Sequence, residues 1–327
     1  METLYPLKFI PVYKNKIWGG NRFRTKLRKL DAPETLCGES WEISGVEDNC
    51  SVVSNGFLKG NTLPELVTLF MDDLVGETVF AKQQTEFPLL FKFLDLIDLL
   101  SIQVHPGDEI AIQRHDSLGK TEMWYIVDAE PGSQLTIGFN KTIDKDTFIE
   151  YVVANKLPEL LNQQTAQSDE VYFIPAGRIH SSGKGLLIAE IQQSSDVTYR
   201  IFDWNRVEPD GTPRELHVSQ SLDVLDYKSQ KEYKTKFTRK MNESIELESC
   251  EYFTVNLLEI DKTIIKDYSN IDSFIAYMCL DGDFVIKTEN NEDVQVSKGE
   301  SVLVPACIKD VKLQPSTTTI KILEVHV

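Results

Sequence analysis

Short runs of β-branched and aromatic residues, separated by Gly, Pro and Asn, recur along this 327-residue chain. They are densest from about residue 245 to the end, where YFTVNLLEI, SFIAYMCL, DFVIKT and TIKILEVHV follow one another. Many short strands with turn signals between them are typical of a barrel or a sandwich. We therefore predict a mainly β protein, and its length allows two domains.

Three stretches interrupt the β pattern and predict helical inserts. Residues 62–75 open with TLPE, a capping box with Pro in the first turn, and continue with apolar residues at helical spacing. Asp144 can cap the first helix of an insert over about residues 141–166, which continues with a second short helix in LPELLNQ. Another capping box, TPRE, predicts a helix over about residues 212–225.

A polar, Lys-rich stretch at residues 227–240 is typical of a solvated linker. We place the domain boundary there. The prediction is a catalytic domain at 1–232, which carries the helical inserts, and a C-terminal β domain at 233–327.

A faint internal repeat supports two related units. The block EVYFIPAGRIH (170–180) resembles ESVLVPACIKD (300–310): each has an acidic residue, an apolar strand, Pro-Ala and a polar end residue. That end residue is His180 in the first block and Asp310 in the second. A duplicated small barrel whose second copy has lost its ligands would produce this pattern.

Charge and motifs exclude several classes of function. The formal net charge of −17 argues against binding to nucleic acid or to an anionic membrane. The chain has no Walker A motif, no G-x-G-x-x-G after a strand and no G-x-S-x-G elbow, which disfavours nucleotide, nicotinamide and serine-hydrolase chemistry. Any anionic substrate needs a local basic pocket in this acidic protein.

Cysteine usage and the N-terminus indicate the compartment. The five cysteines are widely spaced with no CxxC, as expected for reduced thiols. The first residues lack the apolar region of a signal peptide, and the longest apolar run is broken by charges. We expect a cytoplasmic protein that is a monomer or a weak dimer.

Five residues have the types and spacing of a metal site. Gln103 and His105 are two apart on one extended segment, so their side chains share a face. Lys120 and Glu122 have the same spacing on the next segment, and His180 follows a Pro-Ala-Gly turn. Two His and one Glu make a set typical of catalytic zinc sites with open positions. Each residue alone is more often structural, but the combination predicts one divalent metal.

Basic residues near these segments suggest an anion site. Arg200 lies in an apolar-aromatic run, so its charge should meet a partner: either Asp196, in a structural pair, or an anionic group of a substrate. Lys92 lies in another apolar run and either extends to solvent or reaches into a polar site. The basic residues close in sequence to the predicted metal segments are Lys120, Arg178, Lys184, Arg200 and Arg206.

The motifs QVHPGD, GKTEMWYI and IPAGRIHSSGKGLLIAEIQQSSDVTYR, with the N-terminal KIWGG, resemble the type I mannose-6-phosphate isomerases, a cupin family. The resemblance is to the shorter bacterial branch and runs from about residue 8 to the C-terminus. Two departures from the longer members stand out. Their Lys-Pro-Glu is Lys-Thr-Glu here, and their Ala-Gly-Leu-Thr-Pro-Lys after the arginine is Ile-Phe-Asp-Trp-Asn-Arg, so phosphate contacts of that segment are not carried over.

The resemblance implies two cupin-like β-barrel or jelly-roll units, the second degenerate. It implies interconversion of mannose 6-phosphate and fructose 6-phosphate through a cis-enediol(ate), with Arg200 catalytic and Lys120 and Asp196 in the pocket. The base that moves the proton stays open between a lysine and a metal-bound water. The resemblance also implies one Zn²⁺ per chain, held by Gln103, His105, Glu122 and His180.

Two other interpretations compete with this one. The first is another metal-dependent cupin enzyme, such as an iron-dependent sugar-phosphate isomerase or a dioxygenase; basic residues beside the metal favour a sugar phosphate. The second is a catalytically silent, sugar-binding or structural cupin. The intact set of two His and one Glu in the first half argues against a protein without catalytic activity.

Overall fold

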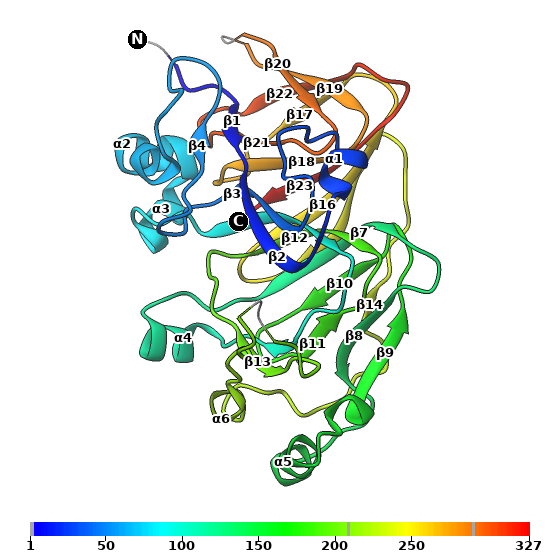
Figure 1. The fold of residues 1–327 in the computed structure, drawn as a ribbon. Coiled ribbons are helices and arrows are strands. Elements are labelled where there is room, and N and C mark those ends of the chain that lie inside the picture. Colours follow the sequence, from blue (N-terminus) through cyan, green and yellow to red (C-terminus); the bar gives the residue numbers. More distant parts are fainter. Residues whose placement is uncertain (1–2, 208–209, 290–291) are drawn as a thin grey trace.

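The computed structural model describes residues 3–207, 210–289 and 292–327, and β-strands make up most of its regular structure (Figure 1). The strands form four sheets. The prediction of a mainly β chain with a few helices is therefore confirmed. Within the described residues, no helix combines the length and apolarity needed to cross a bilayer.

Two of the sheets face each other across the candidate site. We call them the central sheet and the site sheet. The central sheet runs, in spatial order, β14 (Lys234–Thr235), β10 (Val171–Ile174), β7 (Glu122–Ala129), β12 (Leu186–Gln193), β5 (Leu89–Leu96), β2 (Val12–Gly20) and β3 (Cys37–Ile43). The site sheet runs β13 (Tyr199–Phe202), β6 (Ile102–Val104), β11 (His180–Ser182), β8 (Gln134–Phe139) and β9 (Leu161–Thr165).

The other two sheets form the upper part of the molecule in Figure 1. The C-terminal sheet runs β15 (Ser244–Ser249), β16 (Thr254–Ile260), β23 (Ile320–His326), β18 (Ile275–Asp281), β21 (Ser301–Val304), β1 (Leu7–Ile10) and β4 (Val52–Val53). The outer sheet runs β17 (Ile264–Asp267), β22 (Asp310–Pro315), β19 (Asp283–Lys287) and β20 (Val294–Ser297). Two N-terminal strands thus complete the C-terminal sheet. The division at 232/233 stays a prediction.

Strands β5 and β12, in the middle of the central sheet, are buried on both faces, and their side chains alternate between the two faces. In β12, Leu187 and Ile191 join the large core shared with the C-terminal sheet, while Leu186 and Ile188 pack toward the site sheet. Every residue of β5 is buried. Side chains alternate along a strand. Polar residues of β5, β7 and β12 that point to the same face as Leu186 and Ile188 therefore face the site sheet. These residues are Lys92, Glu122, Glu190 and Gln192.

The two similar sequence blocks have equivalent places in the fold. The first forms β10, a turn and the start of β11 at His180; the second forms β21, a turn and the start of β22 at Asp310. Their surroundings differ. An apolar cluster fills most of the space between the C-terminal and outer sheets. A buried polar group lies beside it, in which the Tyr268 hydroxyl donates to Glu324 and the Lys266 ammonium lies 3.0 Å from the same carboxylate. The second copy therefore has a core where the first has a candidate site.

The first two helix predictions are confirmed at their N-termini. The helix α2 (Leu63–Val75) begins with the predicted capping box, in which Thr62 and Glu65 exchange hydrogen bonds. The helix α5 (Lys145–Val153) begins at Asp144, whose carboxylate accepts a 2.8 Å hydrogen bond from the Thr147 amide. The remaining helices are α1 (Arg22–Thr25), α3 (Glu77–Gln83), α4 (Asp108–His115), the 3₁₀ turn η1 (Leu157–Leu160) and α6 (Val218–Ser221).

Two helix predictions were too long. The insert at 141–166 ends in strand β9, because its last residues pair with β8 at the edge of the site sheet. The helix expected over 212–225 is only α6, because its capping box does not form. The Thr212 hydroxyl donates to Asp210, and Arg214 binds the carboxylate of Asp203 instead.

Candidate metal centre and cavity

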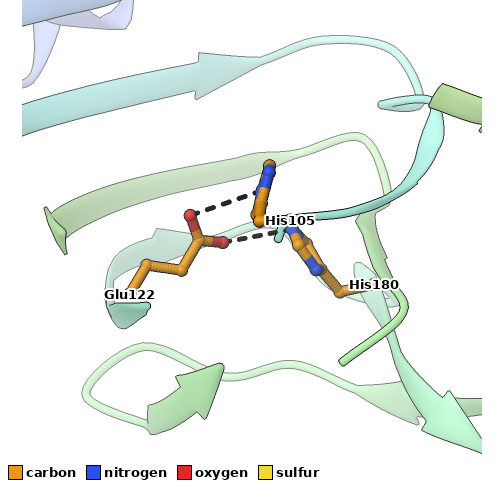
Figure 2. A group of neighbouring side chains, drawn as sticks. All are labelled: His105, Glu122 and His180. Carbon is orange, nitrogen blue, oxygen red and sulfur yellow. Dashed lines mark ion pairs between the residues drawn. The ribbon is translucent and has the colours of Figure 1, made fainter. Parts of the chain in front are cut away.

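Two imidazoles and one carboxylate converge between the central sheet and the site sheet. One ligating atom each of His105, Glu122 and His180 lies within 4.8 Å of the others, and all three side chains are buried. His180 Nε2 lies 3.1 Å from Glu122 Oε1, and His105 Nε2 lies 3.7 Å from Glu122 Oε2 (Figure 2). Each ring therefore faces a different carboxylate oxygen.

Strand pairing and one turn place these side chains. In the site sheet, His180 pairs with Gln103, and Gln103 pairs with Arg200, so the three lie in one row across adjacent strands. Gly177, in the turn before His180, has a positive φ of 88°, and its amide donates to the His105 carbonyl at 2.9 Å. A Cβ at Gly177 would lie 2.7 Å from the Val224 carbonyl, so the turn requires glycine.

Backbone contacts fix the orientation of both rings. His105 Nδ1 lies 2.9 Å from the Val197 carbonyl, and His180 Nδ1 lies 2.9 Å from the Arg178 carbonyl. A carbonyl can only accept, so each Nδ1 carries the hydrogen. In the neutral rings, each Nε2 therefore points a lone pair at the Glu122 carboxylate. This is the arrangement that metal-binding histidines adopt.

The cluster fits a cation. His105 Nε2 and both Glu122 carboxylate oxygens are buried without a hydrogen-bond partner among the described residues. Buried acceptors that face one another without a donor are costly. A divalent cation would satisfy all of them, and two imidazoles with a carboxylate are ligands suited to zinc.

Gln103 lies beside the same point. Its amide group is 3.3 Å from His180 Nε2. A half-turn of the amide presents its oxygen instead of its nitrogen to that point, so Gln103 can supply a fourth ligand. The structure thus brings together all four residues predicted to hold the metal.

The charges around Glu122 keep it ionised and His105 neutral. Burial alone would raise the pKa of the Glu122 carboxyl, but the nearby Lys120 ammonium holds this pKa well below its usual range. Burial, helped by the Lys120 ammonium, lowers the pKa of His105 well below its usual value. These are the protonation states in which both groups bind metals.

A cavity of about 320 Å³ opens beside the cluster, and its wall includes Gln103. Lys120, Asp196 and Arg200, which were predicted to lie in a pocket, all line it. Arg200 is only partly buried, so its charge faces the cavity and is not sealed in a core. Its guanidinium donates a 2.8 Å hydrogen bond to the Glu215 carbonyl.

The cavity wall is locally basic. Six of its side chains are cationic and three are carboxylates, in a chain whose net charge is −17. The cations are Lys14, Lys16, Lys92, Lys120, Arg200 and Arg214, and the carboxylates are Glu39, Glu190 and Asp196. This is the local basic pocket that an anionic substrate requires.

Most of these charged residues were not predicted from the sequence to line a pocket. Lys92, left open between solvent and a polar site, reaches the cavity: its ammonium lies 3.3 Å from Glu190 and 4.8 Å from the centre of the Trp41 ring. Lys14 lies 4.9 Å from the same ring centre. The position of Lys92 inside an apolar run was the one sequence feature that indicated a cavity residue. The sequence around Lys14 and Trp41 contains no comparable feature.

Three predicted basic residues lie elsewhere. Among the described residues that line the cavity, Arg178, Lys184 and Arg206 do not occur. Arg178 donates to the Phe173 carbonyl, Arg206 binds Asp203, and Lys184 is exposed. Closeness in sequence to the metal segments was therefore a poor guide to the anion site.

The remaining histidines are not part of the cluster. His115 ends helix α4, with an exposed side chain whose Nε2 lies 2.8 Å from the Tyr199 hydroxyl. His217 precedes helix α6 and contacts the backbone of Arg200. His326 is at the end of β23.

Comparison with known proteins gives one consistent family. The family model "Phosphomannose isomerase type I, catalytic domain" matches residues 6–137, and "Mannose-6-phosphate isomerase, cupin domain" matches residues 243–324. A mannose-6-phosphate isomerase of Streptococcus mutans is 33% identical over 295 residues, which cover 90% of each chain. One of Bacillus subtilis is 36% identical over 256 residues, covering 77% of this chain and 79% of that protein.

The fold leads to the same family. The crystal structure of the mannose 6-phosphate isomerase from Bacillus subtilis superimposes with a TM-score of 0.88 at 29% identity, over 98% of this chain and 99% of that one. Sequence matches and fold thus agree over nearly the whole length. This chain belongs to the type I mannose-6-phosphate isomerase family.

Proposed function

We propose that this protein interconverts mannose 6-phosphate and fructose 6-phosphate, and that it does so with one Zn²⁺ held by Gln103, His105, Glu122 and His180. One observation carries the proposal: a basic cavity in a strongly acidic chain opens beside a buried cluster of metal-ligand atoms. The family of the relatives agrees with a sugar phosphate as substrate.

Zinc bound at this cluster would supply Lewis-acid stabilisation of negative charge on the sugar oxygens near C1 and C2. The chain's own cations would add to this stabilisation. Arg200 lies next to Gln103 in the site sheet, so its guanidinium can meet the same oxygens or the phosphate. Lys120 lies 3.6 Å from Glu122, on the same side of the cavity as the metal ligands.

The reaction moves one proton between C2 and C1 and a second between the oxygens on these carbons, through a cis-enediol(ate). Lys120 and Glu190 are both buried at the cavity and are suited to holding the first of these protons. Burial raises the pKa of Glu190, although Lys92 opposes the shift, which brings this carboxyl closer to the pH at which it can both take and return a proton. The Trp124 indole donates a 2.8 Å hydrogen bond to Glu190 and fixes its direction.

The remaining charges would bind the phosphate and keep the cavity ordered. Lys16 lies 3.1 Å from Glu39, and Lys92 interacts with the same carboxylate. Burial would raise the pKa of Glu39, but the two lysines bring it to about 2, so it stays ionised and holds their ammonium groups in place. Asp196 lies at the rim and attracts Lys14 electrostatically.

We also propose that the four sheets are two cupin-like units. The central and site sheets would be the catalytic unit, with α5 and α6 at its lower end in Figure 1, whereas α2 packs beside the C-terminal sheet. The C-terminal and outer sheets would be the degenerate one. The equivalent places of His180 and Asp310 at the starts of β11 and β22 support this division.

A coupled isomerase assay tests the function. Purified protein is assayed on mannose 6-phosphate as isolated, after chelation and after return of zinc. The proposal expects activity that is lost on chelation and restored by zinc. Protein that holds zinc but never turns over mannose 6-phosphate would overturn the substrate assignment. Activity that survives full removal of the metal would overturn the role of zinc.

A further inference from the structure

The strand that carries Arg200 is the edge of its sheet. β13 pairs with β6 on one side, and β6 carries Gln103. On its other side, within the described residues, the backbone of Arg200 meets His217, which belongs to the segment that precedes α6. His217 therefore continues the row across the sheet that His180, Gln103 and Arg200 form.

Three hydrogen bonds hold Arg200 from this segment. The His217 amide donates to the Arg200 carbonyl at 2.7 Å, and the Arg200 amide donates to His217 Nδ1 at 3.2 Å. The Arg200 guanidinium donates to the Glu215 carbonyl at 2.8 Å. Both the backbone and the charged end of Arg200 are therefore fixed by residues 215–217.

The contact to Nδ1 sets a requirement on the ring. A nitrogen that accepts must be unprotonated, so His217 has to be neutral with its hydrogen on Nε2. Nε2 lies 3.9 Å from a carboxylate oxygen of Glu215. Burial lowers the pKa of His217, as do Arg200 and His115, while Glu215 opposes the shift. The neutral form therefore prevails at neutral pH.

We propose that His217 is a positioning residue that orients Arg200 toward the cavity through its Nδ1. The inference rests on the proposed function, because it assigns Arg200 to charge stabilisation in the isomerase reaction. Any residue at 217 would supply the backbone amide, but only a side chain with an acceptor at the Nδ1 position satisfies the Arg200 amide as well. A misplacement of about 1 Å in a charge-stabilising group can cost about 100-fold in rate.

Two substitutions distinguish this positioning role from one in which residue 217 only covers the edge strand β13. In His217→Asn, the amide oxygen occupies the place of Nδ1, so the acceptor is kept. In His217→Gln, the polar end lies at the place of Nε2, so the acceptor at Nδ1 is lost while size and polarity are nearly unchanged. His217→Leu is a second variant without an acceptor.

Kinetics on mannose 6-phosphate give the first test, with zinc content measured on every sample. We expect kcat of His217→Gln and His217→Leu to fall about 10- to 100-fold, with KM changed less than about threefold. His217→Asn should keep kcat within about threefold of the parent, and all variants should keep their zinc. Parental kcat in His217→Gln overturns the proposal. So does an equal loss in folded, zinc-loaded His217→Asn and His217→Gln.

Hydrogen exchange gives a test that does not depend on the substrate. Exchange of the Arg200 amide, read by mass spectrometry on a peptide over residues 198–202, should be at least about tenfold faster in His217→Gln and unchanged in His217→Asn. If the parent never turns over mannose 6-phosphate, the proposed function fails but this contact is still tested. Exchange in His217→Gln that matches the parent overturns the contact, and with it the positioning role.

Discussion

The sharpest test of the metal centre is the substitution His105→Asn. The asparagine amide nitrogen can replace Nδ1 and keep the 2.9 Å hydrogen bond to the Val197 carbonyl, whereas the ligand atom Nε2 is removed. We expect this change to cost about 1–3 kcal/mol in the absence of metal, as for an ordinary buried substitution. The stabilisation that zinc adds should be lost altogether.

The size of that stabilisation follows from mass action. Free zinc at 1,000 times its Kd stabilises the folded protein by about 4.1 kcal/mol. For 327 residues unfolding as one unit, an entropy of about 2.1 cal/mol/K per residue gives about 0.7 kcal/mol/K, so the expected rise in Tm is about 6 °C.

The assay is a calorimetric scan of chelated protein with and without added zinc, with the parent and His105→Asn measured side by side. The parent should show the zinc-dependent rise and the variant should not. Asp310→Asn, at the place in the second copy that corresponds to His180, is a control that should keep the rise. A parent whose Tm does not respond to zinc, or a variant that responds equally, would refute the metal centre.

Three further predictions concern the cavity and the fold. Arg200→Met should lower kcat/KM at least about 100-fold while one zinc per chain is retained; an active variant would remove Arg200 from the reaction. Lys92→Met leaves Glu190 buried without its partner and should cost about 3–5 kcal/mol in urea unfolding at pH 7. Since Glu190 has a raised pKa, its contribution to stability is greatest at low pH and is lost as pH rises through that pKa, so the deficit should shrink toward pH 4 and a Glu190→Gln double variant should recover most of it. Thr62→Ala should cost about 1 kcal/mol through loss of the capping box, without changing activity, and a loss below about 0.3 kcal/mol would contradict the cap.

The metal ligands were predictable because their geometry is local. Two residues two apart on a strand share a face whatever the rest of the fold does, which places Gln103 with His105 and Lys120 with Glu122. Helix α2 was predictable for the same reason, since a capping box is satisfied within four residues. The TPRE box failed because the amide and the hydroxyl of Thr212 both donate to Asp210 and not to Glu215.

The basic cavity was not predictable because strand register creates it. Trp41 pairs with Lys92, and Lys14 pairs with Glu39, across strands that are far apart in sequence. A shift of one residue in either register would turn these side chains to the opposite face of the sheet. Neither the charge nor the spacing of Lys14 carries information about that register.

Three lysines of the cavity wall pair with carboxylates, and this pairing bears on how they can meet an anion. Lys16, Lys92 and Lys120 each lie within 4 Å of a carboxylate, at 3.1, 3.3 and 3.6 Å, so part of their charge is already balanced before a substrate arrives. Under the proposed function, this balance would let Lys16 and Lys92 bind the phosphate without holding it too tightly.

The contacts that hold Arg200 from residues 215–217 are neutral dipoles: a carbonyl, a backbone amide and an uncharged imidazole. Such dipoles orient a guanidinium without adding a negative charge from this segment, which suits a preorganised charge-stabilising group. A carboxylate in place of the His217 ring would hold Arg200 equally well but would weaken its field at the sugar. On this reasoning, His217→Asp should keep the fold and the exchange protection of the Arg200 amide, yet lower kcat more than His217→Asn does.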